Sequence, residues 1–251
     1  MVGRIYRFLS CALLLCVSFS GAHAGMTTVA VAANFTPVAR EIADAFTSQT
    51  GHQVRLSFGS TGKLYTQITH GAPFEVFLAA DEERPTLTVE SGLGVVGTEF
   101  TYARGRLVLY SRNAELLKVG SQALSAERNQ GKVALANPQL APYGAAAIEV
   151  LEHLGYLDIS REKLVRGDSI TQTFQFVETG NAEMGFVALA QVANSTRGSR
   201  WIVPESLHTP IRQNAVLLTR GAANPAARAF LEYLDSPEAH DIIRRYGYEV
   251  H

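Results

Sequence analysis

Residues 27–71, TTVAVAANFTPVAREIADAFTSQTGHQVRLSFGSTGKLYTQITHG, contain the pattern that decides the fold. A short apolar run rich in β-branched residues, 27–32, precedes a turn and then apolar residues at helical spacing up to the stop signal Gly51. The plan then repeats at once, with a predicted strand over 54–58 and a helix that stops at Gly71. Two successive strand–turn–helix units indicate a parallel sheet.

The rest of the chain continues this alternation. Further strands are predicted over 74–79, 107–111, 133–136, 164–165, 184–188 and 215–219. Further helices are predicted over 144–154, up to Phe176, and from Pro225 and Pro237. An α/β protein is therefore expected, with mostly parallel sheets and helices on both faces of each sheet.

We expect two lobes because the last strand and helices can pack back on the first sheet. The first lobe is predicted to comprise residues 25–103 and 215–251, and the second residues 104–214. The chain would then cross between the lobes twice, near 101–106 and 210–217, as in proteins that close two lobes on a ligand.

The first 24 residues have the features of a secretory signal peptide. Arg4 and Arg7 precede a short apolar run, and Ala22-His23-Ala24 is an A-x-A cleavage site. The run is too short to cross a bilayer, so an exported chain without direct membrane insertion is expected. Both cysteines, Cys11 and Cys16, lie in this segment, which leaves no disulfide for the mature chain. Their positions disfavour the alternative of a lipid anchor.

Charge excludes some classes of partner. Removal of 24 of the 251 residues leaves 227, and the loss of Arg4 and Arg7 lowers the basic residues from 22 to 20, against 23 acidic ones. This mildly acidic chain is not expected to bind nucleic acid or a membrane surface through its overall field. Any anion site must therefore be local.

Four predicted strand-to-helix turns carry small, polar or backbone-exposing residues, and their edge of the sheet is where such folds bind ligands. They are Ala33-Asn34, Ser60-Thr61, Pro142-Tyr143-Gly144 and Ser169-Ile170. Helix N-termini present unpaired N–H groups and partial positive charge, so several aimed at one cleft bind a dianion without Lys or Arg. Two turns fall in each lobe, which favours an anion site in the cleft.

The alternative is that these polar residues only cap their own helices. Asn34, Thr61 and Ser169 are residue types that commonly do so, and Thr36 with Pro37 is predicted as the N-cap and first residue of the first helix.

Motifs for other chemistry are absent from the sequence. The stretch 59–63, GSTGK, departs from a phosphate-binding loop, because Ser57 stands where its first Gly belongs and Leu64 where Ser or Thr belongs. Lys63 is therefore expected to be solvated. The histidines lack zinc-site spacing, no G-x-S-x-G motif occurs, and Asp81-Glu82-Glu83 is expected at a solvated helix start. We expect no enzyme activity, no cofactor and no metal ion held by protein ligands.

Five ordered stretches carry a resemblance to a known family over essentially the whole mature chain. They are VAVAANFTPVAREIADAF (29–46), LSFGSTGKLYTQI (56–68), GAPFEVFLAADEERPTLT (71–88), VALANPQLAPYGAAAIEVL (133–151) and RRYGYEV (244–250). The chain resembles the periplasmic molybdate-binding proteins of ABC importers. The resemblance implies a type II periplasmic-binding-protein fold with the ligand in the interlobe cleft, and a permease and an ATPase as partners.

The resemblance also implies site residues. Asn34 and Thr61 match first-lobe contacts to the oxyanion, with Ser60 as a neighbour. Tyr143 matches a second-lobe contact, and Ile170 matches a backbone N–H donor. Many family members place Tyr where this chain has Ala188, so the resemblance shifts the second-lobe tyrosine contact to Tyr143. The alternative for Tyr143 is a lid residue whose ring packs and whose hydroxyl reaches water.

The function implied is capture of molybdate, or of the nearly identical tungstate, in the periplasm. A ring of fixed donors sized for these ions would leave the smaller sulfate under-coordinated, and it offers no acceptor to protonated phosphate. Sulfate or phosphate binding, an enzyme on the same fold and a ligand-dependent sensor stay as alternatives. A monomer is expected, since closure of two lobes needs no partner copy.

Overall fold

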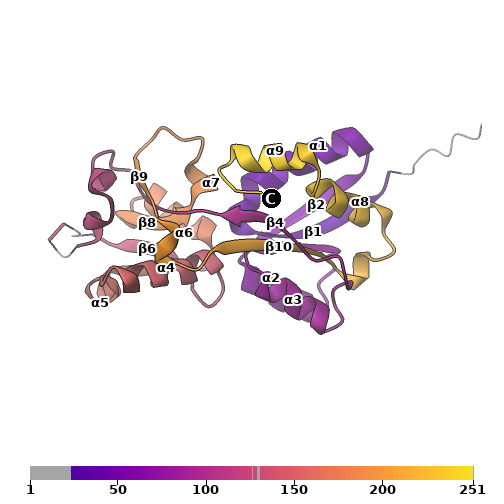
Figure 1. Ribbon diagram of the computed structural model, residues 1–251, viewed down its shortest axis with the longest axis horizontal. Coiled ribbons are helices and arrows are strands. Elements are labelled where there is room, and N and C mark those ends of the chain that lie inside the picture. The colour runs from indigo at the N-terminus through magenta and orange to yellow at the C-terminus, as the bar shows by residue number, and fades with distance from the viewer. Residues whose placement is uncertain (1–23, 126, 129–130, 251) are drawn as a thin grey trace, which may run out of the picture.

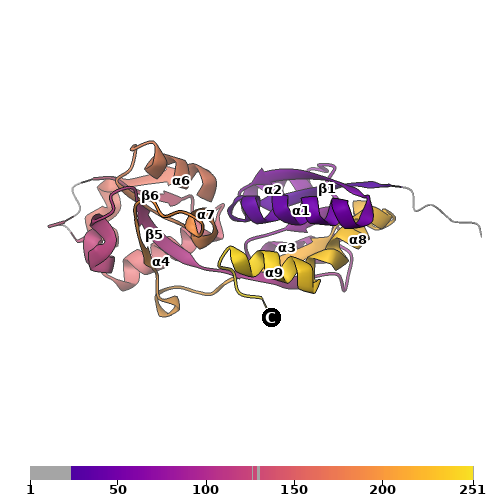
Figure 2. The same ribbon diagram turned by 90° about the horizontal axis from the view of Figure 1, so that it is seen from above.

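The computed structural model describes residues 24–125, 127–128 and 131–250, so the predicted signal peptide, apart from Ala24, lies outside the described residues. These residues form two five-stranded sheets, one in each lobe, which lie side by side along the longest axis (Figures 1 and 2). The predicted α/β two-lobed fold is confirmed. Among the described residues, no helix combines the length and the apolar character needed to span a membrane.

The sheet of the first lobe has the order β2-β1-β3-β10-β4. Its strands are β1 (Met26–Ala32), β2 (Gln53–Gly59), β3 (Val76–Leu78), β4 (Phe100–Gly105) and β10 (Ile211–Leu217). β1 is parallel to β2 and β3, whereas β10 is antiparallel to β3 and β4. Four strands therefore share one direction, in agreement with the predicted mostly parallel sheet.

Helices cover both faces of this sheet (Figure 1). On one side lie α1 (Thr36–Thr50), α8 (Pro225–Leu234) and α9 (Pro237–Arg245), and on the other lie α2 (Thr61–Thr69) and α3 (Glu83–Glu90). Alternation along β1 explains this: Val29 and Val31 share a core with α1, α8 and α9, while Ala30 packs with Leu64 and Ile68 of α2. A strand buried on both faces is expected to be apolar over most of its length, as β1 is from Val29 to Ala32.

The second lobe follows the same plan, with the order β7-β6-β8-β5-β9. Its strands are β5 (Leu107–Ser111), β6 (Val133–Ala136), β7 (Leu164–Gly167), β8 (Met184–Ala188) and β9 (Ser199–Ile202), and its α-helices are α4 (Pro142–His153), α5 (Leu157–Ser160), α6 (Ile170–Glu178) and α7 (Leu189–Val192). Leu107 and Leu109 of β5 pack in the core with α4, and Val108 and Tyr110 pack in the core with α6.

Short 3-10 segments complete the described elements: η1 (Ala33–Phe35), η2 (Leu116–Leu124), η3 (Arg161–Lys163), η4 (Glu205–Leu207) and η5 (Thr219–Gly221). The segment η1 changes the expected start of α1. Phe35, rather than Thr36, occupies the N-cap position, and the Thr36 hydroxyl donates to the Ala33 carbonyl 2.8 Å away instead of accepting a bond from the helix.

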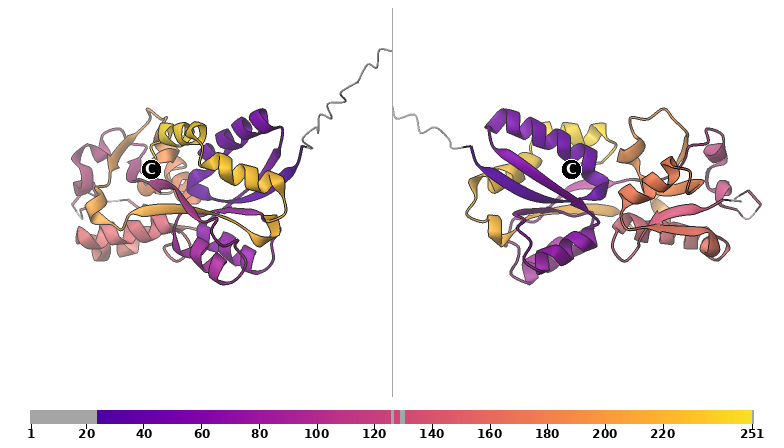
Figure 3. Two further views of the ribbon diagram at one scale, coloured as in Figure 1. Left: turned by 45° about the vertical axis from the view of Figure 1, so that its right-hand side comes forward. Right: turned by 180° about the vertical axis from the view of Figure 1, so that it is seen from behind.

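The chain crosses between the lobes at Arg106, between β4 and β5, and again over residues 203–210, before β10. The whole of β4 and β10 belongs to the first sheet, so the boundaries differ from the predicted 103/104 and 214/215 by two and four residues. The C-terminal helices pack against the first lobe (Figure 3).

Four charged side chains form ion pairs beside this hinge. Arg104 Nη2 lies 3.2 Å from Glu205 Oε2, and Arg106 Nη1 lies 3.0 Å from Glu249 Oε1. Arg104 and Glu249 belong to the first lobe, whereas Arg106 and Glu205 lie in the two crossing segments, so these ion pairs tie both crossing segments to the first lobe.

Candidate anion-binding site between the lobes

The structure brings all four turns together across the cleft. The Thr171 hydroxyl at the start of α6 donates to the Ala33 carbonyl of the first turn, 3.3 Å away. The N–H of Gly62 in α2 donates to the carbonyl of Leu140, 2.9 Å away in the loop before α4. The lobes are therefore closed on each other at the edge where the sequence predicts the site.

The five predicted site residues are all buried between the lobes. The exposed fractions are 1% for Asn34, Thr61 and Tyr143, and 3% for Ser60 and Ile170. They come from the ends of β1 and β2 in the first lobe and from the starts of α4 and α6 in the second. A small ligand held among them would be removed from water.

The hydroxyls of Ser60 and Thr61 are available as donors. Thr61 Oγ1 accepts a hydrogen bond from the N–H of Ala80, 3.1 Å away. The proton of the Thr61 hydroxyl therefore stays available for another acceptor. Ser60 Oγ is buried and has no hydrogen-bond partner among the described residues. Because buried hydroxyls are almost always hydrogen-bonded, the unpartnered Ser60 hydroxyl is a candidate to donate to a ligand.

Asn34 and Tyr143 are instead joined by side-chain hydrogen bonds. Asn34 Nδ2 donates to Gln213 Oε1 at 2.8 Å and to the Tyr248 hydroxyl at 3.0 Å. Gln213 Nε2 donates to the Tyr143 hydroxyl at 3.2 Å, and the Tyr102 hydroxyl donates to Gln213 Oε1 at 3.1 Å. This polar network ties the first turn and the second-lobe helix α4 to the hinge strands β4 and β10.

Glycine at the hinge makes room for the Tyr143 ring. A Cβ at Gly105 would lie 2.1 Å from the Tyr143 hydroxyl oxygen and 2.6 Å from Gln213 Nε2. The hydroxyl of Tyr143 is thus packed against β4 and does not reach water, contrary to the alternative of a lid residue.

The network is uncharged. Burial raises the pKa of Tyr143 well above its ordinary value, as it does the pKa of Tyr102 and Tyr248. The phenols therefore keep their protons at neutral pH and act as neutral donors. A dianion in the cleft would meet hydroxyl and N–H groups from these turns rather than phenolate charge.

Ile170 is the first residue of α6, whose N-cap is Ser169: the Ser169 hydroxyl accepts from the N–H of Gln172, 3.3 Å away. Gln191 holds the same helix start, because its Nε2 donates to the Ile170 carbonyl at 3.2 Å while its Oε1 accepts from the Ala188 N–H at 3.0 Å. Ala188 itself is fully buried. The backbone N–H of Ala188 thus helps to hold the Gln191 side chain, which in turn holds the start of α6.

The capping alternative holds for one residue of three. Ser169 caps α6, whereas the side chains of Asn34 and Thr61 make no cap hydrogen bond to their helices. Lys63, expected to be solvated, is 46% exposed but forms an ion pair across the cleft, with Nζ 2.7 Å from Asp168 Oδ2.

Sequence reasoning missed Tyr102, Gln213 and Tyr248. The only signal was local: Gln213 interrupts the apolar pattern of β10, and Tyr248 lies in the terminal RRYGYEV stretch. Nothing in either stretch indicates that these side chains meet Asn34.

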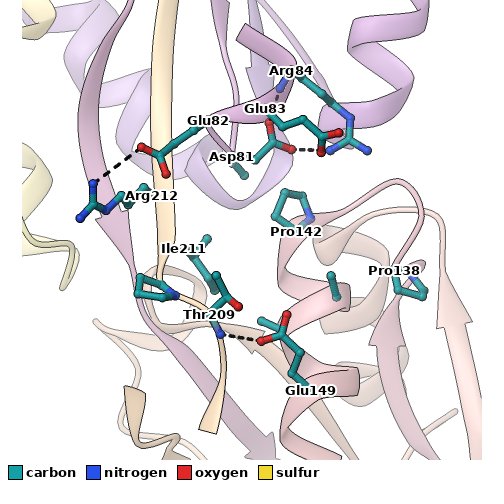
Figure 4. A pocket seen from close by; sticks show the side chains of 14 residues that line it. Asp81, Glu82, Glu83, Arg84, Pro138, Pro142, Glu149, Thr209, Ile211 and Arg212 are labelled. Atoms are coloured by element: carbon teal, nitrogen blue, oxygen red, sulfur yellow. Dashed lines mark hydrogen bonds and ion pairs between the residues drawn. The ribbon is translucent and has the colours of Figure 1, made fainter. Parts of the chain in front are cut away.

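A cavity of about 460 Å³ opens beside the site, between α3 and α4 (Figure 4). Its lining includes Asp81, Glu82, Glu83 and Glu149, together with Arg84 and Arg212. Burial raises the pKa of Asp81 despite the adjacent Arg84. Four acidic side chains against two basic ones repel a dianion, so this cavity is not the candidate site. Within residues 24–125, 127–128 and 131–250, no group of three or more His, Cys, Asp or Glu residues is placed to hold a metal ion.

Two lobes closed on a buried set of neutral donors define a solute-binding protein. Residues 27–249 match the family described as bacterial extracellular solute-binding protein, and the chain belongs to this family. It is 52% identical over 227 residues to the molybdate-binding protein ModA of Rhodobacter capsulatus, which covers 90% of this chain and 89% of that one. It is 49% identical to the molybdate-binding protein ModA of Azotobacter vinelandii, over 98% and 97% of the two chains.

The fold agrees with a solved structure of the same kind. The Azotobacter vinelandii periplasmic molybdate-binding protein superposes with a TM-score of 0.85 and 38% identity, covering 90% of this chain and 99% of that one.

Proposed function

We propose that this protein captures molybdate, with tungstate as a near-equivalent ligand, in the periplasm and delivers it to the permease and ATPase of an ABC importer. The molybdate-binding relatives at 52% and 49% identity, aligned over about nine-tenths of the chain or more, support this ligand and this route. The observation that carries the proposal is the buried, unpartnered hydroxyl of Ser60 beside the Thr61 hydroxyl, at the junction of four helix starts.

The available donors suggest how the oxyanion is held. Ser60 and Thr61 donate through their hydroxyls, and Ile170 through its N–H in the first turn of α6, where no intrahelical acceptor exists. Both N–H groups of the Asn34 amide are engaged by Gln213 and Tyr248, so Asn34 contributes through its backbone N–H. The same holds for Tyr143, at the second position of α4, because its hydroxyl is hydrogen-bonded to both Gln213 and Tyr248.

Closure follows from contact with both lobes. The ligand meets Ser60 and Thr61 on the first lobe and Tyr143 and Ile170 on the second. A ligand that binds the closed state better than the open one shifts the population toward closure. The proposal needs no catalytic step, no cofactor and no metal ion held by side chains, since molybdenum enters as the centre of the oxyanion, and it requires only a monomer.

The second candidate ligand is another tetrahedral oxyanion, sulfate or phosphate. A donor-only site disfavours phosphate, which carries a proton near neutral pH and needs an acceptor. Titration calorimetry of residues 25–251 with molybdate, tungstate, sulfate and phosphate separates these ligands. We expect tight binding of molybdate and tungstate only; equal affinity for sulfate would refute the proposed selectivity.

A further inference from the structure

Gly62 forms a backbone-to-backbone contact between the two lobes. It is buried in the first turn of α2, and its N–H donates to the Leu140 carbonyl, 2.9 Å away. A Cβ at this position would lie 3.1 Å from Leu140 Cα and 3.2 Å from the Leu140 carbonyl oxygen. Such distances are shorter than ordinary van der Waals contact, so the neighbour would have to move.

The backbone conformation of Gly62 gives no reason for glycine at this position. Gly62 is not among the glycines with positive φ, so an L-residue fits its backbone conformation. Within a helix, glycine is less favourable than alanine because it loses more backbone entropy on folding. The three atoms nearest to such a Cβ all belong to Leu140, on the opposite lobe.

Leu140 is held in place by a turn built on Asn137. The N–H groups of Leu140 and Ala141 donate to the Asn137 carbonyl at 3.0 and 2.9 Å, and the N–H of Asn137 donates to the Gly167 carbonyl at 2.7 Å. Asn137 Oδ1 also accepts from the N–H of Gln139 at 3.1 Å. These hydrogen bonds hold the Leu140 backbone, so we expect a Cβ at position 62 to be accommodated by a shift of a few tenths of an ångström between the lobes.

The same turn of α2 carries the proposed donors Ser60 and Thr61. The separation of Gly62 from Leu140 therefore sets how near these hydroxyls come to the donors at the starts of α4 and α6. We propose that Gly62 is the contact that limits lobe closure and thereby sets the size of the oxyanion cage. This inference rests on the proposed function and assigns a specificity-determining role to a residue that does not touch the ligand.

The experiment compares Gly62→Ala with the unmodified protein in titration calorimetry with sodium molybdate and sodium sulfate. We expect molybdate affinity to fall at least tenfold, with no gain for the smaller sulfate. The melting temperature of the ligand-free variant should be equal or higher, because alanine favours the helix.

Gln67→Ala is the matched control, since Gln67 is an exposed residue of the same helix. It should leave molybdate affinity unchanged. The inference is overturned if Gly62→Ala binds molybdate as the unmodified protein does, or if its ligand-free melting temperature falls, which would place the need for glycine inside the first lobe. Failure of the unmodified protein to bind molybdate would instead overturn the proposed function.

Discussion

At the scale of single residues, the sequence indicates which turns form the site but not which atoms are free to bind. Asn34 and Thr61 are both polar turn residues, yet the Asn34 amide is engaged by Gln213 and Tyr248, 179 and 214 positions away. Thr61 keeps a hydroxyl proton to donate. Local pattern cannot reveal such distant partners, so donor roles could not be predicted from the sequence.

Ser60→Ala should weaken molybdate binding by about 1–3 kcal/mol, the range for a lost hydrogen bond to a charged group. It removes a hydroxyl without a protein partner, so the ligand-free protein should unfold at the same denaturant concentration. Thr61→Ala should weaken binding to a similar extent, but it should also lower stability because the N–H of Ala80 loses its acceptor. Calorimetry and urea unfolding measure both effects. Normal molybdate binding by both variants would show that these two hydroxyls do not contact the ligand.

The buried tyrosines predict the response to alkaline pH. Tyr102, Tyr143 and Tyr248 have a pKa raised above the ordinary 10.0 by burial, so the folded state keeps protons that the unfolded state releases. Their contribution to the free energy of unfolding is therefore complete below pH 10 and is lost as the pH rises from 10 toward the folded pKa values. Urea unfolding between pH 8 and 11 should show this decline. Molybdate affinity should stay constant between pH 6 and 9, and a fall in that range would point to an ionising donor.

At the scale of elements, strongly apolar segments were predicted well. The predicted strand 184–188 coincides with β8, whereas β10 begins at Ile211, four residues before the predicted 215. Its first half carries Arg212, Gln213 and Asn214, whose polar side chains interrupt the apolar pattern. These side chains form hydrogen bonds and an ion pair near the hinge. The short strands β4 and β9 were not predicted, because half-exposed hinge and edge strands carry a weak apolar signal.

Two serine caps test the role of the α6 N-terminus. The Ser169 hydroxyl accepts from the Gln172 N–H at 3.3 Å, and the Ser236 hydroxyl accepts from the Ala239 N–H at 3.2 Å at the start of α9, in the tail of the first lobe. Replacement of either serine by alanine should cost about 1 kcal/mol of stability. Only Ser169→Ala should also weaken molybdate binding, because it loosens the turn that presents the Ile170 N–H. Equal affinities for the two variants would show that α6 does not hold the anion.

At the scale of the whole molecule, the sequence predicted two lobes and their double crossing, because alternating strands and helices follow simple packing rules. The closed contacts between the lobes were not predicted. Lys63 is the example: from the sequence it is a solvated first-turn residue, and only the approach of the second lobe gives it Asp168 as a partner.

Lys63→Ala should weaken molybdate binding less than about fivefold at low salt, since exposed ion pairs contribute about 0–1 kcal/mol. The effect should vanish at about 1 M NaCl, where the screening length is about 3 Å. The control is Lys118→Ala, which breaks an exposed pair of the same 2.7 Å length, with Glu115 inside the second lobe. Calorimetry at two salt concentrations checks this. Identical low-salt affinities for the two variants would show that the pair adds nothing to closure.

The position of β10 between β3 and β4 governs the order in which the lobes can fold. All strands of the second sheet lie within residues 107–202, whereas the first sheet waits for residues 211–217 to fill its interior. A chain that emerges N-terminus first can therefore complete the second sheet before the first, whose sheet has to close a loop of more than 130 residues between Leu78 and Ile211. We therefore expect the lobe that begins first in the sequence to complete its fold last.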